Sequence, residues 1–233
     1  MPDLYELARG PLFRLSFLIM ALGLLRLFLL SLFGIVQMVR RARDKNNSYG
    51  KILLTTASWM LPVHRLHRHI PLISFSSFLF HAGVIVVPLF LLDHIYLWQA
   101  SIGIAWPGIS RSVADVLTLL TLITGTLLLG FRIFSRSIRQ NSGFVDYFLL
   151  IVLLLIFATG YIASRPYNPI PYQTVMLIHL LSAEVFLVLT PFTKIAHCIL
   201  FPLIRLTSEL AWKFPPDAGR NVTIQVHGEV KSI

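Results

Sequence analysis

The sequence predicts an all-α integral membrane protein in which five transmembrane helices form a bundle. Hydrophobic residues make up 56% of the 233 residues, whereas charged residues make up only 13%. The mean hydropathy is +0.75, which is well outside the usual balance of soluble domains. Five apolar runs each reach the length of about 20 residues that is needed to cross ~30 Å of hydrocarbon. Composition and run length together predict a chain that lies in contact with membrane lipid.

The five spans follow one another with short connections. The first apolar run is too long for a signal peptide and has no small-residue cleavage site after it, so we expect it to be retained. The spans form a membrane domain over residues 1–206, which includes an interfacial segment at 46–69 that is too polar to cross. Residues 207–233 form a cytoplasmic C-terminal extension. The predicted spans are Leu12–Val39, Pro71–Leu97, Val113–Phe134, Phe144–Ala163 and Gln173–Leu200.

Basic residues predict the orientation of the chain. Lysines and arginines gather after the first span, before the second, and between the third and fourth, whereas the opposite loops carry mainly Arg111 and Arg165. By the positive-inside rule the N-terminus lies outside and the C-terminus lies in the cytoplasm. We therefore expect a multi-pass protein of the prokaryotic cytoplasmic (inner) membrane. This clustering explains the net charge of +10, so nucleic acid is not an expected partner.

Four histidines are distributed over two of the predicted spans. His179 and His197 are eighteen residues apart, which on a regular helix places both imidazoles on one face, roughly 27 Å apart. His81 and His94 are thirteen residues apart, which gives a rotation of about 220° and a rise of roughly 20 Å, with Pro88 between them as a possible kink. The topology places His94 and His179 at the outer side and His81 and His197 at the inner side.

Two such pairs are what two stacked haems with bis-imidazole ligation require. The single cysteine, Cys198, excludes an internal disulfide, an iron–sulfur cluster built from this chain alone, and thioether attachment of haem. Any single histidine in a span can instead form a hydrogen bond to a neighbouring helix. His69, which lies just before the second span, is an alternative to His81 as a ligand of the inner haem.

Two motifs carry a resemblance to a known family. The segment Phe80-His81-Ala82-Gly83-Val84 and the segment Pro191-Phe192-Thr193-Lys194-Ile195-Ala196-His197 resemble the di-haem cytochrome b (gamma) subunit of respiratory nitrate reductase. The resemblance extends over roughly Pro71 to Leu206. The histidines of the second span stand farther apart than in the nitrate reductase subunit, so the sequence indicates a relative outside the true nitrate reductases.

The resemblance implies an electron-transfer function. Family members take electrons from quinol at the outer side, pass them through two haem b groups, and deliver them to a redox partner at the inner face. It therefore implies a subunit of a respiratory oxidoreductase complex, with haem iron held by His81, His94, His179 and His197. The implied partners are iron–sulfur or other redox subunits at the cytoplasmic side, or a multihaem cytochrome.

Other charged residues are candidates for the cofactors' polar groups. Arg111 and Arg165 outside, with Arg132 and Lys194 inside, are candidate partners of haem propionates because their cationic groups pair with carboxylates. Asp93 and Asp115, with Arg111, are candidates for a quinone site, because quinol oxidation needs a proton acceptor. The alternative is that both aspartates are ordinary helix-end charges. Glu184 either relays a proton or is neutralised by a neighbouring helix.

Two other functions fit part of the sequence. A haem-free membrane anchor subunit would also consist of apolar helices with a basic inner face. A small transporter would place polar residues on broken helices near the midplane, usually in repeated halves, and the sequence contains no internal repeat.

Overall fold

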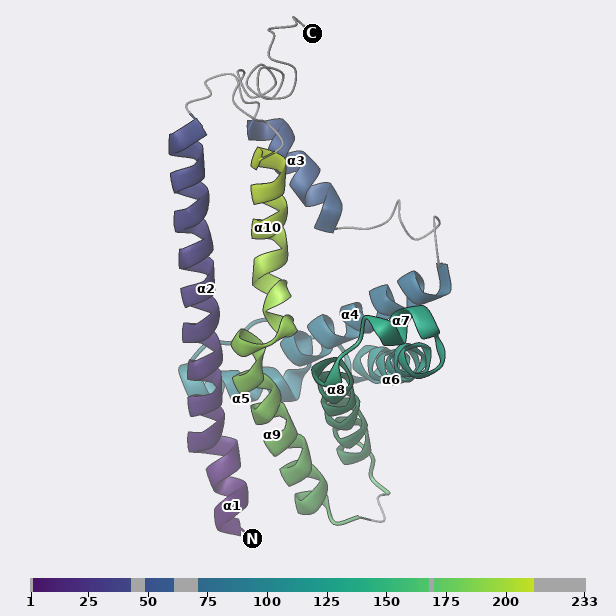
Figure 1. The fold of residues 1–233 in the computed structure, drawn as a ribbon. Helices are drawn as coiled ribbons and strands as arrows, with labels where there is room; N and C mark the ends of the chain where they lie inside the picture. Colours follow the sequence, from purple (N-terminus) through teal and green to yellow (C-terminus); the bar gives the residue numbers. More distant parts are fainter. Residues whose placement is uncertain (1, 43–48, 61–70, 168–169, 212–233) are drawn as a thin grey trace, which may run out of the picture. The chain divides into compact units, whose positions relative to one another are not determined.

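The computed structural model describes residues 2–42, 49–60, 71–167 and 170–211 (Figure 1). These residues are helical, apart from short connections, and they form no strand. Five helices are long and apolar enough to cross a membrane, which confirms the all-α, multi-pass prediction. Their bounds are Leu4–Arg40, Pro71–Phe90, Arg111–Phe134, Phe144–Ala163 and Tyr172–Phe192.

The chain divides into two compact units. One contains residues 1–20 and 64–193, and the other contains residues 21–63 and 194–233. The first helical stretch consists of α1 (Pro2–Leu7), a wide π-type turn at Ala8–Leu12, and α2 (Phe13–Ala42). Pro11 lies inside the wide turn, where its missing N–H disrupts the regular α-helical pattern.

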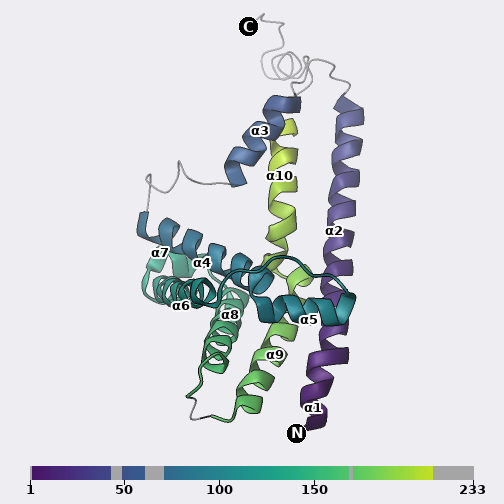
Figure 2. The same cartoon turned by 180° about the vertical axis from the view of Figure 1, so that it is seen from behind.

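Four helices form the core of the first unit. They are α4 (Pro71–Phe90), α6 (Arg111–Phe134), α8 (Phe144–Ala163) and α9 (Tyr172–Leu189). Helix α4 packs on α6, α6 packs on α8, and α8 packs on α9 (Figure 2). The approach of α4 to α6 requires a glycine at Gly83, because a Cβ there would lie 1.6 Å from Oγ1 of Thr121. Small residues allow this close packing between apolar helices.

The second predicted span is broken, which corrects its predicted end at Leu97. Helix α4 contains Pro88 and ends at Phe90, Leu91 is extended, and α5 (Leu92–Ile102) follows. The following loop stabilises this end of α4, because Trp106 Nε1 donates to the carbonyl of Leu89 at 2.7 Å and the amide of Ile109 donates to the carbonyl of Phe90 at 2.9 Å. The rotation of about 220° between His81 and His94 assumed one regular helix and therefore does not apply.

The fifth predicted span is also broken, which corrects its predicted range of Gln173–Leu200. After α9, a 3₁₀ turn at Thr190–Phe192 contains Pro191, Thr193 is extended, and a second 3₁₀ turn, Lys194–Ala196, leads into α10 (His197–Ala211). Proline removes a helical N–H, and the Thr190 and Thr193 hydroxyls each donate to a backbone carbonyl four residues earlier at 2.8 Å. His179 and His197 therefore do not lie on one continuous helix, and the prediction that they share a helix face does not apply.

In the second unit, α3 (Tyr49–Met60) packs beside α10. Ile52 and Thr56, one helical turn apart, are buried on α3, whereas Leu53 and Leu54 are exposed. This amphipathic arrangement is consistent with the predicted interfacial segment. The rest of that segment, which includes His69, and the extension beyond Ala211 lie outside the described residues.

Candidate functional site

The imidazoles of His94 and His179 lie next to each other in the first unit. Their ring centroids are 6.1 Å apart and their planes differ by 10°. His94 comes from α5 and His179 from α9, and both side chains are half-buried. The structure therefore brings together the two histidines that were predicted to form the outer pair.

The separation of these rings can be compared with that expected for a shared metal ion. A metal–imidazole bond is about 2.0–2.1 Å long, as for zinc, and a ring nitrogen lies roughly 1.1 Å from its centroid, so collinear ligands place the centroids about 6.3 Å apart. The observed separation of the ring centroids, 6.1 Å, is close to this value.

Helix α8 fixes the position of the His179 ring. The Nδ1 atom lies 2.9 Å from the carbonyl oxygen of Ile156 and 3.3 Å from Oγ1 of Thr159. Because a carbonyl only accepts hydrogen bonds, Nδ1 carries the hydrogen and Nε2 keeps the lone pair that binds a metal. Gly160 provides the space for the ring, since a Cβ there would lie 3.0 Å from Cε1 of His179.

His94 has a different environment. Its Nδ1 is buried and has no hydrogen-bond partner among the described residues. A buried polar atom without a partner costs about 1–3 kcal/mol and requires an explanation. A cofactor bound at the other ring nitrogen would not supply this partner, because Nδ1 would still have no contact.

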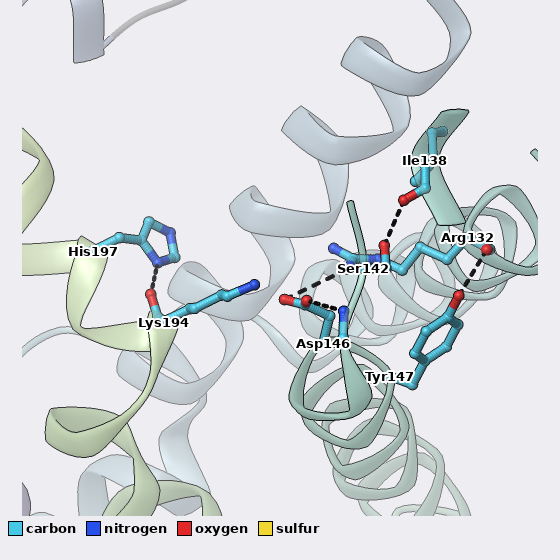
Figure 3. Close-up of polar contacts among 8 residues, drawn as sticks. Arg132, Ile138, Ser142, Asp146, Tyr147, Lys194 and His197 are labelled. Atoms are coloured by element: carbon cyan, nitrogen blue, oxygen red, sulfur yellow. Dashed lines mark hydrogen bonds and ion pairs between the residues drawn. The ribbon is translucent and has the colours of Figure 1, made fainter. Parts of the chain in front are cut away.

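His81 and His197 are both exposed and belong to separate units. The Nδ1 of His81 lies 2.7 Å from the carbonyl oxygen of Ser77, and that of His197 lies 2.6 Å from the carbonyl oxygen of Lys194 (Figure 3). Each contact leaves Nε2 as the nitrogen with the lone pair. The pairing of His81 with His197 stays a prediction.

Three of the charged residues that were predicted to lie on the outer side, Arg111, Asp115 and Arg165, form one cluster. The Arg165 guanidinium forms an ion pair with Asp115 at 2.9 Å and lies 4.1 Å from the centroid of the Tyr161 ring. Arg111 donates to the carbonyl of Ser164. These contacts connect α6 to the end of α8. Within them, the Asp115 carboxylate is paired with the Arg165 guanidinium.

Asp93 lies apart from these contacts, on α5 beside His94. Its charge, and that of Arg9 in the N-terminal helix, act on Tyr172 at the start of α9. Arg9 and Tyr172 were not among the candidate site residues predicted from the sequence. The predicted topology puts both at the outer ends of spans, and that position could have identified them as neighbours of Asp93.

At the opposite end of α6, Arg132 is part of a helix connection. Its guanidinium lies 3.8 Å from the Asp146 carboxylate, and its backbone carbonyl accepts from the Tyr147 hydroxyl at 2.9 Å (Figure 3). Asp146 also accepts from the amide of Gly143 at 2.8 Å, which caps the start of α8. The other predicted inner cation, Lys194, belongs to the second unit.

Glu184 is the most buried carboxyl group described. It is 4% exposed on α9, and neither carboxyl oxygen has a hydrogen-bond partner in the described part of the chain. No group of three or more His, Cys, Asp or Glu residues with the geometry of a metal site occurs among the residues described. Haem iron takes only two axial ligands from the protein, so the His94 and His179 pair is sufficient for it.

Comparison with known proteins gives a relative whose name does not state a function. No family model and no solved structure matches the chain significantly. A protein of Nitratidesulfovibrio vulgaris (strain Hildenborough), whose name is given only as "Protein", is 30% identical over 206 residues. The match covers 87% of this chain and 90% of that protein. It therefore extends over nearly the whole of both chains.

Proposed function

We propose that this chain, which belongs to the same family as the Nitratidesulfovibrio vulgaris protein, is the di-haem cytochrome b subunit of a respiratory complex. It transfers electrons between the membrane quinone pool and a partner redox subunit. The observation that carries the proposal is the His94 and His179 pair, with its 6.1 Å centroid separation and nearly parallel rings. Haem b supplies one-electron chemistry when it is bound.

The residues around this pair would orient the ligands before the cofactor binds. The carbonyl of Ile156 accepts from Nδ1 of His179, which sets the tautomer and increases the basicity of the ligating nitrogen. Gly160 allows the ring to lie against α8. Phe157 and Leu180, which follow Ile156 and His179 in the sequence, are buried.

His81 and His197 would hold the second haem. Their Nδ1 contacts with backbone carbonyls favour the same tautomer as in His179. In the proposed orientation, with the N-terminus outside and the C-terminus in the cytoplasm, this haem lies on the inner side. Arg132 and Lys194 are the candidates for its propionates, and an iron–sulfur or other redox subunit would dock at the cytoplasmic face.

Quinol oxidation would take place beside the outer haem. Asp93 is adjacent to His94 in the sequence. It would be the carboxylate that accepts a proton from quinol, because Asp115 is engaged with Arg165. Protons released there would remain on the outer side of the membrane.

A reduced-minus-oxidised visible spectrum of the purified full-length protein, with pyridine haemochrome quantitation against protein, tests the proposal. We expect two low-spin b-type haems per chain. The proposal would be contradicted if the protein inserts in the membrane and is purified with its native complex but contains no haem. That result would favour a haem-free anchor subunit.

A small transporter is the second candidate, because two membrane helices are broken and Glu184 is a buried carboxyl group without a partner among the described residues. Transporters place ionisable groups on broken helices near the midplane. Haem-free protein whose ion flux in vesicles is abolished by Glu184→Gln would support this function. Two haems per chain and no such flux would exclude it.

A further inference from the structure

An open depression lies where the start of α6 meets the end of α8. Its volume is about 490 Å³, and it is lined by Arg111, Ala163, Ser164, Arg165 and Pro166. All of these residues belong to the first unit. Two guanidinium groups therefore face one hollow, which is the donor set that phosphate and carboxylate groups prefer.

Among the described residues, few groups accept hydrogen bonds from the two arginines of this cluster. Each guanidinium has five N–H donors. Arg111 donates to the carbonyl of Ser164, and Arg165 pairs with Asp115. The Nε of Arg165 is buried and has no partner among the described residues. Two arginines against one aspartate leave one positive charge, so the cluster can accept a monoanion.

Both the depression and the histidine pair involve α8 or the residues just after it. Arg165 contacts Asp115 of α6, whereas Ile156, Thr159 and Gly160 contact His179 of α9.

The level of the depression in the membrane identifies the kind of anion. Arg111 is the first residue of one span and Ala163 is the last residue of another, which places the depression at the boundary between hydrocarbon and headgroups. An anion attached to acyl chains would place its charge on the arginines and its chains in the adjoining hydrocarbon.

We propose that the depression between Arg111 and Arg165 binds the phosphate group of an anionic phospholipid. This site does not rest on the proposed function. Asp115 competes with the phosphate for Arg165, and it also holds the guanidinium in place when no lipid is bound.

Native mass spectrometry of the full-length protein with phosphatidylglycerol tests this site, with phosphatidylcholine and inorganic phosphate as the comparison ligands. We expect one tightly held phosphatidylglycerol per chain. Arg111→Gln and Arg165→Gln should each weaken its binding by at least about tenfold, because each removes a charge-assisted contact. Arg136→Gln, which alters an exposed arginine on α7 beyond the other end of α6, is the matched control and should bind as the unaltered protein does.

Asp115→Asn keeps both arginines and removes the competing carboxylate, so we expect it to bind phosphatidylglycerol more tightly. This variant tests the site even if Arg165→Gln fails to fold. Unchanged phosphatidylglycerol binding in Arg111→Gln and Arg165→Gln would overturn the proposal, as would equal binding of inorganic phosphate. Loss of a haem signal in these variants, with unchanged lipid binding, would overturn it in favour of a propionate contact. Haem spectra of the same samples test the proposed function separately.

Discussion

The two predicted histidine pairs differ in how far packing defines them. His94 and His179 are half-buried and face each other within one compact unit, with parallel rings. His81 and His197 are exposed, belong to different units, and contact carbonyls only three or four residues away. The first pair is formed by contacts between α5, α8 and α9 within one unit, whereas the two members of the second pair belong to different units.

The difference shows where a cofactor site can be prepared before the cofactor is present. His179 is positioned by a carbonyl and a glycine of another helix. Such contacts are already in place in the folded protein and reduce the cost of ordering the ligand when it binds. We therefore expect the outer site to respond to changes in α8 and the inner site to be insensitive to them.

The largest effect is expected from the outer ligands themselves. His94→Ala and His179→Ala should each reduce the haem content from two to one per chain, because bis-histidine ligation needs both imidazoles. The double variant should also retain one haem, since both residues serve the same site. Haem quantitation checks this result. Tyr167→Phe, at a residue that is 95% exposed, is the control. A double variant with no haem would show that the two histidines belong to different haems.

A smaller effect is expected from Gly160→Ala. The new Cβ would lie 3.0 Å from Cε1 of His179, and overpacking of this kind costs about 1–3 kcal/mol. We expect a lower occupancy or a shifted midpoint potential of the outer haem alone, measured by redox titration. Gly130→Ala is the matched control, because a Cβ there would meet nothing within 4 Å. Equal behaviour of the two variants would mean that α8 does not position His179.

The smallest effect is expected from Thr159→Val. The hydroxyl lies 3.3 Å from Nδ1 of His179, but the carbonyl of Ile156 lies closer to the same atom at 2.9 Å. Removal of one weak partner should cost at most about 0.5–1.5 kcal/mol. We expect full haem content and a small shift in the outer midpoint potential. Thr126→Val, on α6, is the control, because its hydroxyl donates only to Leu122 of its own helix. Loss of the outer haem in Thr159→Val would make the hydroxyl the main support of the ring.

Much of the fold could be predicted from the sequence. The fourth span was predicted with its observed bounds, Phe144–Ala163, and the third differs only at its start. Both spans lack proline, so apolar length alone sets where they begin and end. The second and fifth spans ended earlier than predicted, because Pro88 and Pro191 weaken the helix and nearby residues supply other hydrogen-bond partners.

The candidate site was predictable in its residue types and only partly in its arrangement. The depth argument predicted that His94 and His179 lie near each other, and their rings do so, although the helical rotation used for the second span did not apply. Their ligation of one haem stays a prediction. The depth argument held because the predicted order of the spans fixes which span ends are near each other. It did not reveal that Asp115 pairs with Arg165, since an ion pair depends on how two helices are rotated and packed.

The sequence by itself determined the membrane environment, the helical class, the number of spans and the choice of histidines as candidate ligands. These follow from apolar run length and residue chemistry, which are local properties of the chain. Only the tertiary structure decided where the second and fifth spans break, how the rings of His94 and His179 face each other, and which arginine pairs with Asp115. These features depend on side chains and backbone groups that are far apart in the sequence and meet only when the helices pack.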